Sequence, residues 1–290
     1  MTSTNSGIVL VDKPAGVTSQ HAVVRVREAL GVDRAGHTGT LDPFATGLLL
    51  VLVGRATRLA SFVEDEPKEY ETLVRFGVET DTDDVTGEPV RTAALPDAAA
   101  VRDAIAALTG DLDQVPPAFS AKHVDGRRAY ALARRGTPAE LRPVRVRVDR
   151  WEVLGQTADT LRARVRCYRG TYIRALARDL GRLTASAAHC AELRRVRCGA
   201  FSVDDAVPPD GATAAHVRPA RIAVAGLPTQ EVDEAGALGI AHGRATTATV
   251  AGAHAAIVKD GELLAIAERS GDHWLPRVVL FDPSNLAPRA

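Results

Sequence analysis

Apolar and polar residues alternate along three stretches of the chain, with the period of two that is typical of strands buried on one face. Residues 7–11 are expected to form a short strand, and the unbroken apolar run at 48–53 favours a strand buried on both faces. Together these patterns predict a β-sheet with an apolar core. The alternating faces consist of Tyr70, Thr72, Val74 and Phe76; of Val144, Val146 and Val148; and of Leu161, Ala163, Val165 and Cys167.

Apolar residues spaced by three or four predict three helices, over residues 19–30, 97–108 and 172–183. We expect Ser19 and Thr171 to act as N-caps, because their hydroxyls can accept hydrogen bonds from the first turn. Strands and helices interleave without a strict βαβ rhythm. The pattern therefore predicts an α+β fold with a mixed sheet rather than a doubly wound one.

The order of these elements suggests two domains. Residues 207–220 are rich in proline, glycine and alanine and are expected to form a linker, and the short strands beyond them indicate a small β-rich domain. We assign residues 1–220 to a first domain and 221–290 to a second. A basic, proline-punctuated insertion with one short helix is expected within the first domain, at about 116–145.

Composition adds little until charge is followed along the chain. The 290 residues carry no net charge and are 46% hydrophobic, enough for a core. Residues 61–115 hold 14 acidic and 4 basic side chains, whereas residues 162–198 hold 10 basic and 2 acidic ones, and residues 122–150 hold 9 and 3. The arginine-rich faces of two strands suit a polyanion, as do Arg174, Arg178 and Arg182, which are spaced by four and expected to lie on the surface of the third helix. Ordinary solvated arginines explain the same pattern equally well.

Other function classes find no support in the sequence. The three cysteines lack the spacing of a zinc site and are expected to be reduced thiols, and the histidines form no metal-binding motif. The N-terminus does not have the pattern of a signal peptide, and the longest apolar run is too short for a membrane span. We therefore expect a cytoplasmic protein without metal or membrane contact.

The most distinctive segment is GHTGTLDPFATGLLLV, at residues 36–51. It places a single carboxylate, Asp42, between a glycine-rich turn and a buried strand. An Asp-Pro pair is common in turns, so Asp42 could simply start one. As a nucleophile or base, it would need a nearby cation to stay ionised, and Arg174 is a candidate. A glycosidase would need a second carboxylate, which no motif identifies, and neither calcium nor nucleotide motifs fit.

Seven blocks in order give the chain a resemblance to the bacterial tRNA pseudouridine-55 synthase family. They cover most of residues 8–205, and the GHTGTLDP block is the most specific. The end of the chain is similar, more loosely, to the PUA-type RNA-binding modules of that family. The blocks are DKPAGVTS (12–19), GHTGTLDPFATGLL (36–49), KEYE (68–71), GVETDTDD (77–84), VPPAFSAKHVDGRRAYALARRG (115–136), RGTYIRALARDLG (169–181) and ELRRVRCGAF (192–201).

The resemblance implies an isomerase that detaches a uracil from its ribose, turns it and rejoins it through C5, without any cofactor. Asp42 would be the essential nucleophile or base, paired with Arg174. A base extruded from the tRNA T-arm would stack on Tyr70. The insertion would close over the T-arm. The remaining substrate-binding positions implied are Tyr172 near the pocket, Leu193 as an apolar wall, His37 at the T-loop and Lys13 in a supporting loop.

The family pattern is not followed everywhere, and other readings stay open. His123 stands where the family's SAxK pattern has lysine, which affects one expected phosphate contact. A non-catalytic tRNA-binding or tRNA-folding factor would share the scaffold. A guide-RNA-dependent relative and an unrelated carbohydrate hydrolase are further alternatives. The resemblance favours a stand-alone monomer that acts on tRNA without guide RNA.

Overall fold

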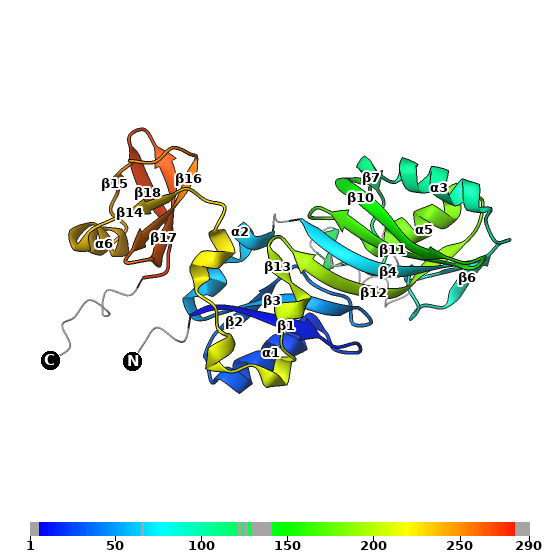
Figure 1. Ribbon diagram of the computed structural model, residues 1–290, viewed down its shortest axis with the longest axis horizontal. Helices are drawn as coiled ribbons and strands as arrows, with labels where there is room; N and C mark the ends of the chain where they lie inside the picture. Colours follow the sequence, from blue (N-terminus) through cyan, green and yellow to red (C-terminus); the bar gives the residue numbers. More distant parts are fainter. Residues whose placement is uncertain (1–5, 65–66, 121–122, 125–126, 129–140, 282–290) are drawn as a thin grey trace.

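The computed structural model describes residues 6–64, 67–120, 123–124, 127–128 and 141–281. Its largest element is a nine-stranded mixed sheet (Figure 1). The α+β class and the mixed sheet expected from the sequence are confirmed. In spatial order the main strands are β1 (Gly7–Lys13), β3 (Thr46–Val53), β12 (Ala188–Cys198), β4 (Lys68–Phe76), β11 (Thr160–Cys167), β10 (Val144–Gln156) and β7 (Gly110–Gln114), while β2 (Ala35–Thr38) pairs with β3 and β13 (Phe201–Ser202) pairs with β12.

The alternating patterns give the expected faces. Along β11, Leu161, Ala163, Val165 and Cys167 are all buried, and the arginines between them are more exposed. The run in β3 is buried on both sides from Gly47 onward, because α1 (Ser19–Leu30) covers one face and the C-terminal part of the chain packs on the other. The helices α3 (Ala98–Ala107) and α5 (Ile173–Leu183) cover the other half of the sheet.

The two halves of the sheet are joined by a very short link. β12 runs parallel to β3 over only two residue pairs, Arg194 with Thr46 and Arg195 with Gly47. A side chain on Gly47 would meet the Arg195 carbonyl oxygen at 2.3 Å, and the φ of Gly47 is +100°. Only glycine allows this close approach of two backbones. The third glycine of the GHTG…G segment thus determines where the two halves meet.

Two capping predictions are wrong, although the helices lie where they were expected. The N-cap of α1 is Thr18, whose hydroxyl accepts from the His21 amide, because Ser19 is already buried inside the first turn. The N-cap of α5 is Tyr172 rather than Thr171, and its amide donates to the Gln114 side chain.

The segment 207–220 is not a free linker. Its ends pair with the edge strand β1, because Val207 bridges to Val11 and Arg218 bridges to Ile8. Four backbone hydrogen bonds of 2.9–3.0 Å accompany these bridges. The segment contains the short 3-10 turns η3 (Pro209–Gly211) and η4 (Ala214–His216), flanked by η2 (Val203–Asp205) and η5 (Ala220–Val224).

The C-terminal part is β-rich, as expected, with one helix, α6 (Glu234–Ala241). Its sheet packs on the first part through a shared apolar cluster, and Arg55 and Arg58 donate to the carbonyls of Phe281 and Val279. The boundary at residue 220 stays a prediction. In spatial order the five strands are β14 (Thr229–Glu231), β16 (His254–Lys259), β17 (Glu262–Ser270), β18 (His273–Val279) and β15 (Thr246–Thr247) (Figure 1).

The remaining elements are short. The helix expected inside the basic insertion lies outside the described residues. Within the insertion, the described residues 123–124 and 127–128 pair with each other as two short antiparallel strands. Among the helices that the structure describes, none is both long and apolar enough to cross a bilayer. The short elements are η1 (Gly54–Leu59), α2 (Ala60–Glu64), β5 (Val78–Thr80), β6 (Pro89–Thr92), β8 (His123–Val124) and β9 (Arg127–Arg128).

Candidate active site

Asp42 lies in the loop between β2 and β3, and this loop is tied to the start of the chain. The buried Ser19 hydroxyl donates to the Leu41 carbonyl at 3.0 Å and accepts from the Leu41 amide at 2.9 Å. The Lys13 ammonium and the Gly16 amide both donate to the Pro43 carbonyl, at 3.4 and 2.8 Å. The residues on both sides of Asp42 are therefore fixed. Ser19 was expected to be a helix cap, and its structural role was not foreseen.

Arg174 holds the Asp42 carboxylate in a bidentate pair, as the sequence suggested. Its Nε donates to Asp42 Oδ2 at 2.9 Å and its Nη2 donates to Asp42 Oδ1 at 3.0 Å. The same guanidinium donates to the carbonyls of Thr82 and Phe119, at 2.7 and 2.9 Å. Arg174 is 3% exposed and Asp42 is 34% exposed, so the pair presents its carboxylate end to solvent. Such fork-to-fork contacts fix the plane of a carboxylate.

The acidic segment at 79–84 meets the arginines of α5. Arg174 lies 3.4 Å from a second carboxylate, Asp84, while Arg178 contacts Asp83 at 2.8 Å and Arg182 contacts Glu79 at 2.5 Å. The expectation that these arginines lie on the helix surface is wrong for Arg174 and Arg178, which are buried. The helix is amphipathic, but two of its arginines belong to the buried face because carboxylates meet them there.

Asp84 is a site neighbour that the sequence alone did not single out. It is buried, and its Oδ1 accepts from the Thr82 hydroxyl and from both the amide and the hydroxyl of Thr86, at 2.6–2.9 Å. The only signal was the clustering of carboxylates in ETDTDD, opposite arginines spaced by four. Neither feature alone identifies the partner.

The surroundings of Asp42 shift the pKa of its carboxyl in opposite directions. Burial raises the pKa of the Asp42 carboxyl above its ordinary value, and the neighbouring Asp84 adds to this effect. Arg174 and, more weakly, Lys13 lower the pKa. Arg174 thus has the expected influence, but burial outweighs it. The fully buried Lys13 has a pKa lowered to about 8, because burial disfavours its charge more than Asp42 favours it.

Tyr70 and Leu193 lie on neighbouring strands, on the face that carries the Asp42 loop. Tyr70, Leu193, Leu41 and Phe44 belong to one apolar cluster, with Leu193 7% exposed and Tyr70 half-buried. Burial raises the pKa of Tyr70 to about 12, so its hydroxyl is neutral at physiological pH. Tyr70 belongs to the same apolar cluster as Leu41, the residue before Asp42.

Tyr172 and His37 are placed less closely. Tyr172 is half-buried at the start of α5, and the charges of Arg174 and Asp42 both act on its hydroxyl, whose pKa burial raises. His37 is half-buried on β2, opposite Val51, five residues before Asp42. The structure therefore brings Asp42, Arg174 and Lys13 into one network, with Tyr70, Tyr172 and Leu193 around it. The substrate roles of all these residues stay predictions.

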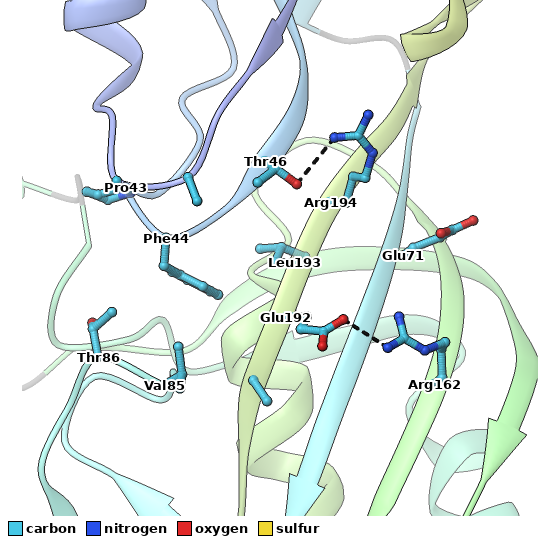
Figure 2. A pocket seen from close by; sticks show the side chains of 13 residues that line it. Pro43, Phe44, Thr46, Glu71, Val85, Thr86, Arg162, Glu192, Leu193 and Arg194 are labelled. Carbon is cyan, nitrogen blue, oxygen red and sulfur yellow. Dashed lines mark hydrogen bonds and ion pairs between the residues drawn. The ribbon is translucent and has the colours of Figure 1, made fainter.

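A cleft of about 630 Å³ opens beside this network. Pro43, Phe44 and Thr46 line it from the Asp42 loop, and Leu193 and Arg194 line it from β12 (Figure 2). Figure 2 shows an apolar region around Phe44 and Leu193, and a charged rim in which Arg162 contacts Glu192 at 2.9 Å. An apolar floor with a polar rim is typical of a small-molecule or nucleobase site.

The arginine face of β11 differs from the unpaired basic surface that a polyanion site would present. Arg162, Arg164 and Arg166 each contact a glutamate of β12 or β4, at 2.9, 2.6 and 3.4 Å. Neighbouring strands thus neutralise much of the row. No group of three histidine, cysteine, aspartate or glutamate side chains within the described part of the chain is arranged to hold a metal ion.

Comparison with known proteins places this geometry in a family. Residues 27–173 match the model described as "TruB family pseudouridylate synthase (N terminal domain)". A tRNA pseudouridine synthase B of Mycobacterium sp. (strain KMS) is 42% identical over 294 residues, which covers 97% of each chain. The protein of the same name from Aromatoleum aromaticum is 48% identical over 202 residues, covering 69% of this chain and 66% of the relative.

Solved structures share the fold at lower identity. The Cbf5-Nop10-Gar1 complex contains a chain that is 23% identical, with a TM-score of 0.74, over 97% of this chain and 87% of the other. At this identity the likeness concerns the fold. The similarity covers almost the whole chain, including the C-terminal sheet.

Proposed function

The chain belongs to the TruB family of pseudouridylate synthases, and we propose that it isomerises the T-loop uridine at position 55 of tRNA to pseudouridine. The N1–C1′ bond of the nucleotide breaks, the uracil turns and a C5–C1′ bond forms, while C5 loses its proton and N1 gains one. Product and substrate are isomers, so the reaction needs no oxidant or cofactor. The observation that carries the proposal is the bidentate Asp42–Arg174 pair.

Asp42 acts on the ribose during glycosidic cleavage. Its carboxylate is oriented by Arg174 and fixed in place by the anchored loop, which supports a reaction that depends on alignment. Arg174 itself is fully engaged with two carboxylates and two carbonyls, so it positions Asp42. Lys13, through Pro43, supports the same loop.

A base inside a folded T-arm must first be extruded, which costs a few kcal/mol. Tyr70 provides a ring for the extruded uracil, while Leu193 and Tyr172 limit the pocket on other sides. His37 contacts the disturbed T-loop, from its position on β2. RNA recognition then depends on the T-arm fold and on splayed bases, as is usual for structured RNA.

The partner is tRNA itself, without guide RNA. The relatives similar over almost the whole chain are named tRNA pseudouridine synthase B, which supports a stand-alone enzyme. We propose that the chain works as a monomer in the cytoplasm. The basic insertion closes over the T-arm, with His123 at one position where the family has lysine, and a PUA-like second domain from residue 221 adds RNA contacts.

The carbohydrate hydrolase alternative requires a second carboxyl group that is free to act near Asp42. Hydrolases of this kind place two carboxyl groups on either side of the scissile bond. The nearest candidate, Asp84, is buried, and its Oδ1 already accepts three hydrogen bonds while Oδ2 faces Arg174. It is therefore a partner of Arg174 and has no room to act as a second acid or base.

The test uses an unmodified tRNA transcript with tritium at uridine C5. We expect tritium release, loss of that release when the T-loop uridine is replaced by cytidine, and pseudouridine mapped to position 55. Binding should also weaken steeply with salt, because several phosphates are neutralised. Tight, salt-sensitive binding without release would instead favour the tRNA-folding factor. Release from another position would contradict the assigned substrate.

A further inference from the structure

Arg195 occupies the point where the two halves of the large sheet meet. It lies opposite Gly47 of β3 on one side and opposite Tyr70 of β4 on the other. Residues directly opposite in an antiparallel pair have adjacent side chains on one face. One residue of β12 therefore touches both the end of the Asp42 loop and the strand of Tyr70.

The side chain of Arg195 lies near residues on both sides of Asp42 in the sequence. It is 1% exposed, and its Nε donates to the Leu48 carbonyl at 2.6 Å, just after the loop. Its Nη1 lies 3.2 Å from the point that a Cβ on Gly39 would occupy, near the start of the loop. The guanidinium thus donates to a residue just after the segment that carries Asp42 and lies close to Gly39 near its start.

The same guanidinium acts on Tyr70. Burial is the main reason that the Tyr70 pKa is raised, while the charge of Arg195, which lies opposite Tyr70 on the neighbouring strand, lowers it. Other titratable groups near this pair include the side chains of Cys167 and Cys198 and the ammonium groups of Lys13 and Lys68. Arg195 thereby lies between the Asp42 loop and Tyr70, the two parts that the proposed function places around a uridine.

Burying Arg195 costs free energy that ordinary packing would avoid. No carboxylate within the described residues forms an ion pair with it, and its Nη2 is buried with no hydrogen-bond partner among them. The preceding residue, Arg194, pairs with Asp12 at 2.8 Å. A buried, incompletely satisfied cation needs an explanation, and such groups are often retained at functional sites.

We propose that Arg195 is a positioning residue for the isomerisation, which holds the Tyr70 hydroxyl and the Asp42 loop at a fixed separation. The inference rests on the proposed function and extends it to a side chain that does not line the cleft. A glutamine at this position keeps a polar group but loses the fork, so the loop and Tyr70 can shift independently. A misplacement of about 1 Å can slow a reaction about 100-fold.

The experiment measures single-turnover tritium release, with enzyme in excess so that slow variants can be followed. We expect Arg195→Gln to slow release about 100-fold while the Kd for tRNA changes less than about threefold. In a Tyr70→Phe background, the same change should slow release less than about tenfold, because coupled residues are not additive. The exposed Arg197 of the same strand provides Arg197→Gln as the matched control, with an expected rate close to wild type.

An equal loss of rate in both backgrounds would overturn the proposal, since a merely structural effect is additive with Tyr70→Phe. A wild-type rate for Arg195→Gln would overturn it as well. If Arg195→Gln does not fold, Arg195→Lys provides the test. This variant keeps the buried charge and should release tritium about tenfold more slowly than wild type. An unchanged rate for Arg195→Lys would count against the proposal. No release from the wild-type protein would contradict both the proposed function and this inference. Normal release from the wild-type protein together with an unaffected variant would contradict this inference alone.

Discussion

Two rows of arginines look alike in the sequence and differ in the structure. On β11, Arg162, Arg164 and Arg166 are spaced by two, and their side chains are 36–46% exposed. On α5, Arg174 and Arg178 are spaced by four and are 3% and 7% exposed. Both rows face carboxylates, but solvent screens only the first. Regular spacing reveals that a row exists, and burial decides what it does.

The difference has an energetic consequence. Exposed ion pairs contribute about 0–1 kcal/mol to the free energy of unfolding, whereas loss of one partner of a buried pair costs about 3–5 kcal/mol. The penalty arises because the remaining charge has no counterion. Substitutions in the two rows therefore test the comparison directly.

Arg174→Gln should have the largest effect. It leaves Asp42 and the buried Asp84 without their cation, so we expect the free energy of unfolding to fall by about 3–5 kcal/mol and tritium release to be lost. Thermal and urea unfolding measure the first effect. A variant as stable as wild type would show that the buried row is no different from the exposed one.

Arg178→Gln should destabilise the protein by about 3 kcal/mol while sparing more of the activity. It removes the partner of Asp83 and the donor to the Val115 carbonyl, but the Asp42–Arg174 pair stays intact. Arg182→Gln on the same helix is the control, because Arg182 is 55% exposed. An activity loss as complete as that of Arg174→Gln would mean that the arginines of α5 act as one unit.

Asp83 gives the buried row a pH dependence. Burial raises the pKa of its carboxyl from 3.8 to about 6, against the effect of Arg178. The folded state therefore binds the proton more tightly than the unfolded state, and this contribution to stability falls as the pH rises from about 4 to about 6. We expect a fall of about 3 kcal/mol.

The check compares wild type with Asp83→Asn. Asp83 has a φ of +60°, which asparagine tolerates well. The difference in the free energy of unfolding between the two proteins should change across pH 4–6 and be constant above that range. A constant difference throughout would contradict a raised pKa.

Arg164→Gln should have the smallest effect. The pair with Glu71 is short, at 2.6 Å, but both side chains are about one-third exposed. We expect less than about 1 kcal/mol of destabilisation and a smaller effect at high salt. If the loss of binding free energy for tRNA exceeds the loss of unfolding free energy, this face contacts phosphates as well as glutamates.

Local patterns predicted most elements of the fold. Alternation identified β4, β10 and β11, and the apolar run at 48–53 identified β3, because the period and length of a pattern reflect burial directly. The pairing of 207–220 with β1 was missed, because proline and glycine also occur in chains that pair at an edge. Ser19 was assigned as a cap because capping is its commonest role, whereas a contact 22 residues away was not visible.

The candidate site depended more on resemblance than on pattern. Asp42 and Arg174 are 132 residues apart, and no local rule joins them. Asp84 and Arg195 could not be assigned, since each looks like one member of an ordinary charge run until its burial is known. The acidic and basic segments are separate in the sequence. Inside the fold they partly neutralise each other.

The account depends most directly on Asp42, and one measurement tests it. Single-turnover tritium release from the tRNA transcript should be abolished by Asp42→Asn, while tRNA binding and the melting temperature stay close to those of wild type. Asparagine keeps the shape and one of the two hydrogen bonds from Arg174, which still faces Asp84, but it removes the charge that acts on the ribose. Release at the wild-type rate from a folded Asp42→Asn protein would contradict the role given to this carboxylate.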